Sequence, residues 1–93
     1  MPKYVIERNL PGAGRLSPAE LEQIAARSNG VLRELGPDIQ WVHSYVTADT
    51  IYCVYRAASA DLVREHARRG GFPADRVSEV ASVIHPGTAS GEP

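Results

Sequence analysis

Hydrophobic and polar residues alternate along the chain with two different periods, which predict strands and helices. The segment KYVIER (Lys3–Arg8) is rich in β-branched and aromatic residues and runs into the Pro- and Gly-rich stretch NLPGAGR. This composition is typical of a strand that ends in a loop. We therefore predict a first strand over Lys3–Arg8.

A helix is predicted directly after that loop. Ser17 can accept from the first-turn amides, Pro18 suits the first helical position, and Glu20 completes a capping box. Gly36-Pro37 ends the pattern. Spacings of three and four place one buried stripe on this helix, made of Leu21, Ile24, Ala25, Ser28, Val31, Leu32 and Leu35.

Two runs of strand-forming residues, Ile39–Val46 and Ile51–Tyr55, flank the sequence TADT and predict an antiparallel hairpin. A loop of even length places one set of cross-strand pairs on one face: Trp41 with Arg56, His43 with Val54, and Tyr45 with Tyr52. The other face then carries Val42, Ser44, Val46, Ile51, Cys53 and Tyr55, and we expect helices to cover it. A loop of three or five residues would instead place His43 opposite Cys53 or Tyr55.

The last third of the chain predicts a second helix, a fourth strand and a tail. Ser59 can cap the helix and Gly70-Gly71 can end it, with the apolar stripe supplied by Leu62, Val63, His66 and Ala67. RVSEVASVI (Arg76–Ile84) is rich in valine and predicts a strand. Residues 86–93 offer almost nothing to bury, so we expect a disordered tail after a domain of residues 2–85.

The order β-α-β-β-α-β is that of the ferredoxin-like fold, an α+β sandwich with two helices on one face of an antiparallel sheet. The other face of the sheet stays uncovered in one copy. We expect Trp41, Tyr45, Tyr52 and Val54 to lie on this open face, where a second subunit or a ligand would cover them. The geometry favours a homodimer that forms through the sheet.

Composition narrows the function classes. The 93 residues have a net charge of −1, which gives no field that favours nucleic acid or an anionic membrane. The single cysteine, Cys53, excludes an internal disulfide and multi-cysteine metal sites within one chain. We find neither a signal-peptide pattern nor an apolar run of about 20 residues, so we expect a cytoplasmic protein.

Polar candidates for chemistry gather on the expected open face: Glu7, His43, Tyr45, Tyr52 and Glu79. Imidazole and carboxylate groups can ligate a divalent metal, and an imidazole near neutrality can also act as an acid or base. Alternatively, these polar groups pair across a dimer interface and have no catalytic or metal-binding role.

His66 and Glu65 are a second pair of candidate metal ligands. Adjacent residues of a helix point about 100° apart, which disfavours one ion shared between them. A hydrogen bond from His66 to the backbone or to the GGFP turn is the structural alternative. We expect Cys53 to act as a small packed hydrophobe.

The stretches PKYVIER, LSPAELE, LGPDIQWVHSYVT, IYCVY and REHARRGGFPADRVSEV together resemble a family of small bacterial proteins described as nickel-responsive, ferredoxin-like domains. The resemblance spans about residues 2–84. It implies a ferredoxin-like homodimer that binds nickel at surface sites, with a role in nickel sequestration or detoxification. It identifies no ligand motif, so the metal candidates His43, His66, Glu65, Glu7 and Glu79 follow from the residue types alone.

Three functions remain open from the sequence. The first is a non-enzymatic, nickel-binding dimer. The second is a small enzyme or binding protein for an organic ligand that uses a sheet-face pocket of His43, Tyr45, Tyr52 and Glu7. The third is an interaction module anchored by Trp41 and the tyrosines.

Overall fold

The computed structural model describes all 93 residues and contains six main elements in the predicted order. They are β1 (Lys3–Asn9), α1 (Pro18–Leu35), β2 (Ile39–Val46), β3 (Thr50–Ala57), α2 (Ala60–Gly70) and β4 (Arg76–Glu79). Two short 3-10 helices, η1 (Ala13–Arg15) and η2 (Pro86–Ser90), lie outside this pattern.

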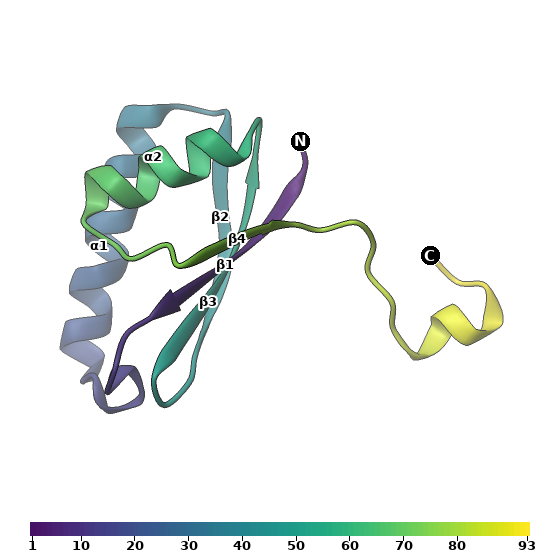
Figure 1. Ribbon diagram of the computed structural model, residues 1–93, viewed down its shortest axis with the longest axis horizontal. Coiled ribbons are helices and arrows are strands. Elements are labelled where there is room, and N and C mark those ends of the chain that lie inside the picture. Colours follow the sequence, from purple (N-terminus) through teal and green to yellow (C-terminus); the bar gives the residue numbers. More distant parts are fainter.

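The four strands form one antiparallel sheet in the order β2-β3-β1-β4, and both helices cover the same face (Figure 1). The predicted ferredoxin-like α+β architecture is therefore confirmed. The core lies between the sheet and the helices, and its largest fully buried side chains are Ile6, Tyr55, Val63 and His66.

The helix boundaries follow from the predicted caps. The Ser17 hydroxyl accepts from the Glu20 amide, and the Glu20 carboxylate accepts from the Ser17 amide, which completes the capping box. The Ser59 hydroxyl likewise accepts from the Leu62 amide. Gly71, with a φ of 69°, ends α2 in the left-handed conformation that glycine adopts without strain.

The hairpin confirms two of the three predicted cross-strand pairs. Tyr45 lies opposite Tyr52 and His43 lies opposite Val54, but Trp41 lies opposite Tyr55 and not opposite Arg56. A β-bulge between Trp41 and His43 inserts Val42 as an extra residue. Because side chains alternate across a strand, the extra residue turns Trp41 to the helix side, and its predicted place on the open face is wrong.

The fourth strand is shorter than its valine content predicts, because it ends at Glu79 and not at Ile84. Glu79 pairs with Tyr4, and the Val80 amide donates to the Lys3 carbonyl at the first residue of β1. Beyond this point β1 offers no further backbone partner. Val83 and Ile84 are consequently exposed.

The loop after β1 holds the tip of the hairpin. The Asp49 carboxylate accepts from the Gly12 amide at 2.9 Å, and the Gly14 amide donates to the Ala48 carbonyl. A side chain at Gly14 would meet the Ala48 Cα at 3.0 Å, so this close approach favours glycine.

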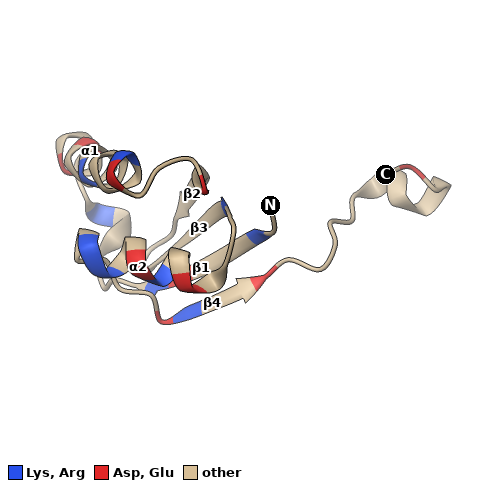
Figure 2. Cartoon of the chain, turned by 90° about the horizontal axis from the view of Figure 1, so that it is seen from above, with Lys and Arg blue, Asp and Glu red and all other residues tan.

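The segment after β4 runs away from the domain on the side opposite the helices (Figures 1 and 2). Residues 86–90 form η2, for which the sequence predicted no structure. Hydrogen bonds at His85 and beyond connect residues within this segment. No helix of the chain has both the length and the apolar composition needed to cross a membrane.

Candidate functional site

Strand pairing fixes which side chains share the open face of the sheet. One row across the four strands contains Tyr45, Tyr52, Glu7 and Arg76, and the next contains His43, Val54, Val5 and Ser78. Arg76 Nε lies 4.0 Å from Glu7 Oε2. The face therefore combines an aromatic half at β2 and β3 with a charged half at β1 and β4.

The structure brings only part of the predicted open-face set together. His43 and Glu7 share this face, but β3 lies between their strands and they occupy adjacent rows. Glu79 pairs with Tyr4, whose side chain is buried on the helix side, so strand alternation directs Glu79 away from the open face. The predicted place of Glu79 on the open face is wrong.

Glu65 is engaged by two arginines of its own helix. Its Oε1 accepts from Arg69 Nε at 2.7 Å and also pairs with Arg68 Nη2, while its Oε2 accepts from Arg68 Nε at 3.0 Å. These hydrogen bonds lower the pKa of the Glu65 carboxyl to about 2. A metal ion at Glu65 would have to displace both arginines.

His66 is fully buried, and its Nε2 lies 3.1 Å from Ser28 Oγ. Its ring packs against Tyr55 on one side and stacks on Phe72 on another. Burial lowers the pKa of His66 because it disfavours the imidazolium, and the nearby Arg8 guanidinium acts in the same direction. The structure thus gives His66 the hydrogen-bonded alternative, with a side-chain hydroxyl in place of the backbone. Its ring lies in the core, whereas Glu65 bonds to Arg68 and Arg69 and His43 is exposed.

His43 is the exposed imidazole among the predicted ligands, and its ring meets the Tyr45 ring edge-on with centroids 4.9 Å apart. No group of three His, Cys, Asp or Glu side chains within one chain is placed to hold a metal ion. One copy alone therefore offers at most two such side chains at any one place.

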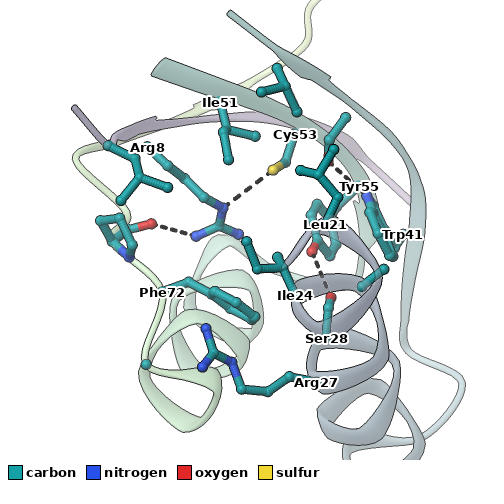
Figure 3. Close-up of a pocket in the computed structure, with 16 residues that line it drawn as sticks. Arg8, Leu21, Ile24, Arg27, Ser28, Trp41, Ile51, Cys53, Tyr55 and Phe72 are labelled. Atoms are coloured by element: carbon teal, nitrogen blue, oxygen red, sulfur yellow. Dashed lines mark hydrogen bonds between the residues drawn. The ribbon is translucent and has the colours of Figure 1, made fainter. Parts of the chain in front are cut away.

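The only cavity of the structure lies on the helix side of the sheet, and not on the open face where an organic ligand was expected. It has a volume of about 360 Å³. The sheet supplies Arg8, Trp41, Ser44, Ile51, Cys53 and Tyr55, α1 supplies Leu21, Ile24, Arg27 and Ser28, and the turn after α2 supplies Phe72 and Pro73 (Figure 3).

Arg8 places a guanidinium inside this largely apolar cavity. Its side chain is 4% exposed, its Nε donates to Cys53 Sγ at 3.2 Å, and its Nη1 donates to the Pro73 carbonyl. Arg8 Nη2 is buried without a hydrogen-bond partner. Cys53 packs on the helix-covered face as predicted.

Sequence reasoning missed Arg8, although a signal for it exists. Tyr4, Ile6 and Arg8 alternate along β1, so the period that buries the first two residues also buries the third. A charged residue at a buried strand position seldom occurs without a partner. The alternation along β1 therefore predicts a buried arginine on the helix side of the sheet, which is a signal for a partner or ligand there.

A four-stranded antiparallel sheet with two helices on one face and a cavity between the layers defines the class: a small ferredoxin-like α+β domain. A sequence model described as "Nickel responsive protein SCO4226-like" matches residues 4–80, and the chain belongs to this family. The crystal structure of SCO4226 from Streptomyces coelicolor A3(2) is similar, with a TM-score of 0.75 and 20% sequence identity over 88% of this chain and 99% of that one. A search of curated proteins found no significant match.

Proposed function

We propose that the protein is a non-enzymatic nickel-binding protein that holds the ion between the open faces of two copies. The observation that carries the proposal is the position of His43, an exposed imidazole on the uncovered face of a domain whose family is described as nickel-responsive. Withdrawal of free nickel by such a dimer is the sequestration role that the resemblance implies.

The donor types of the open face suit nickel, but their number in one chain does not. Imidazole nitrogen and carboxylate oxygen bind divalent first-row metals, and Glu7 and His43 supply one of each. Because one chain holds no cluster of three donors, the ion needs ligands from a second copy. His43 is the donor we assign, and Glu7 is the second candidate on the same face.

The aromatic half of the open face supports association of two copies. Tyr45 is 59% exposed and Tyr52 is 36% exposed, and Val54 pairs with His43 in the adjacent row. Large exposed apolar side chains that cluster on one face are typical of interaction surfaces. A symmetric pairing of this face would bring the two copies of His43 to a common interface.

Calorimetric titration of nickel into chelator-stripped protein tests the proposal. The chain must carry no histidine tag, since a tag would bind the metal itself. We expect a dissociation constant below about 1 mM, an at least tenfold loss in His43→Ala, and a dimer in sedimentation velocity.

His85→Ala is the matched control, because His85 is also exposed but lies in the segment that runs away from the domain. It should bind nickel like the unmodified protein. Equal affinity of His43→Ala and the unmodified protein, or no binding tighter than about 1 mM, would overturn the assignment.

A further inference from the structure

We propose that the cavity between the sheet and the helices binds a small organic carboxylate with an aromatic or branched apolar body, and that Arg8 anchors the carboxylate. This site lies on the opposite side of the sheet from His43 and does not depend on nickel. Three features of the cavity point to such a ligand: the uncompensated charge of Arg8, the apolar walls, and a second arginine at the edge.

Arg8 is a buried cation that no protein carboxylate neutralises. The residues that line the cavity include no Asp or Glu, and Arg8 takes part in none of the ion pairs of the chain. Asp75 does not form an ion pair with Arg8, and its carboxylate instead accepts from the Asn9 amide at 2.6 Å. A buried charge without a counter-ion is costly, so an anion supplied from outside would stabilise this arrangement.

The guanidinium also retains free hydrogen-bonding capacity. Its five N–H groups form a fork that matches a carboxylate, yet the protein occupies only Nε and Nη1. Figure 3 shows the guanidinium reaching from β1 into the space between the sheet and the helices. Bonds to Cys53 and the Pro73 carbonyl hold it there and leave Nη2 for a ligand oxygen.

The walls select an apolar body for the ligand. Leu21, Ile24 and Ile51 supply aliphatic surface, and the Trp41 and Tyr55 rings lie stacked with centroids 6.5 Å apart. A volume of about 360 Å³ lies within the range of small-molecule sites. The apolar walls and single buried cation favour a monocarboxylate over phosphate, which carries more charge and needs more donors.

A second guanidinium lies at the edge of the cavity. Arg27 is exposed and its guanidinium carbon lies 4.7 Å from the centroid of the Phe72 ring, while the guanidinium carbon of Arg8 lies 5.4 Å from the same centroid. Phe72 therefore lies between the two cations (Figure 3). Arg27 adds positive potential where an anion would enter.

Fluorescence titration of the full chain tests the site, because Trp41 is the single tryptophan and lines the cavity. The probe is phenylacetate in the presence of a metal chelator, and phenylacetamide is its neutral analogue of the same size. We expect saturable quenching or enhancement with a dissociation constant below about 1 mM for phenylacetate, and at least tenfold weaker binding of phenylacetamide.

Arg8→Met should weaken phenylacetate binding at least tenfold, whereas Arg33→Met should leave it unchanged. Arg33 is exposed on α1 and does not line the cavity. Its substitution by methionine removes the same charge as Arg8→Met. Equal affinity of the acid and the amide for the unmodified protein overturns the proposal even if Arg8→Met does not fold. Absence of saturable binding by phenylacetate also overturns it.

Discussion

The Trp41 indole donates a hydrogen bond to Ser44 Oγ at 2.9 Å, although the two residues are three positions apart on the same strand. In a regular strand an odd separation places side chains on opposite faces. The bulge at Val42 adds one residue to the strand without a change of face. Trp41 and Ser44 therefore lie on the same side of the sheet, and both line the cavity. One extra residue in an edge strand thus decides which side of the sheet carries the tryptophan.

We predict that deletion of Val42 keeps the fold and leaves Trp41 in the cavity. The deletion joins Trp41, which pairs with Tyr55, directly to His43, which pairs with Val54, and so restores a regular ladder. The free energy of unfolding should change by less than about 1 kcal/mol. Urea denaturation and the wavelength of tryptophan emission measure the two effects.

Deletion of Gln40 is the matched control, because it removes one residue from the same strand at a regular position. It forces either Ile39 or Trp41 to the open face and should cost about 2–4 kcal/mol. If the two deletions destabilise the protein equally, the bulge does not set the orientation of Trp41.

The free energy of unfolding should rise by about 1 kcal/mol or more in Arg8→Met, in contrast to most substitutions of a buried residue. Methionine keeps much of the length of the side chain and removes a buried charge without a counter-ion. The loss of the hydrogen bond to the Pro73 carbonyl offsets part of this gain. Chemical denaturation of the ligand-free protein measures the net change.

Arg33→Met provides the reference for Arg8→Met, since it removes an exposed arginine and should change stability by less than about 0.5 kcal/mol. A loss of several kcal/mol in Arg8→Met would show that the protein itself compensates the charge.

The sequence predicted the elements well because their signals are local. Ser17 with Glu20, Ser59 and Gly71 act on their own helix ends, and the even loop at TADT fixes the pair of Tyr45 and Tyr52. The bulge had no such signal, since an extra residue in an edge strand is stabilised by packing on the helix side that the local sequence does not encode.

The predicted sites depended on relations between distant segments, and these were less predictable. Alternation within β4 does not reveal which face Glu79 takes until its pair with Tyr4 is known. Glu65 shares a helix with Arg68 and Arg69 at the spacings of three and four that place side chains together, so its engagement could have been predicted. The position of Arg8 carried a usable signal, but its missing counter-ion is visible only in the folded chain.

Protonation of His66 should destabilise the protein as the pH falls. Because burial lowers the pKa of His66 in the folded state, the unfolded chain binds the proton first, and stability is lost below the ordinary value of about 6.5. This residue can contribute a slope of at most about 1.4 kcal/mol per pH unit between pH 6.5 and its lowered pKa. Urea denaturation between pH 7.5 and 5 measures it.

His66→Gln should flatten that dependence, because glutamine can still bond to Ser28 but does not titrate. His85→Gln, at an exposed position, should keep the dependence of the unmodified protein. An unchanged slope in His66→Gln would assign the effect to another group.

Nickel affinity should not change in Glu65→Gln. Both carboxylate oxygens of Glu65 are held by arginines, and the low pKa of about 2 reflects that engagement. Calorimetric titration compares the variant with Glu7→Gln, which removes the carboxylate that shares the open face with His43. Weaker binding in Glu65→Gln would place the metal on α2 and not on the sheet.

Tyr45→Lys should weaken self-association if the open face pairs two copies. The substitution replaces an aromatic side chain that is 59% exposed in one copy with a cation, and a two-fold interface through this face would bury that cation from each copy. We expect the dimer dissociation constant from sedimentation equilibrium to rise at least tenfold. Gln23→Lys adds the same charge at an exposed position of α1, on the opposite side of the molecule, and should leave association unchanged. If Gln23→Lys dissociates the dimer and Tyr45→Lys does not, the copies meet through the helices, and nickel bound at His43 would then have to find its remaining ligands elsewhere.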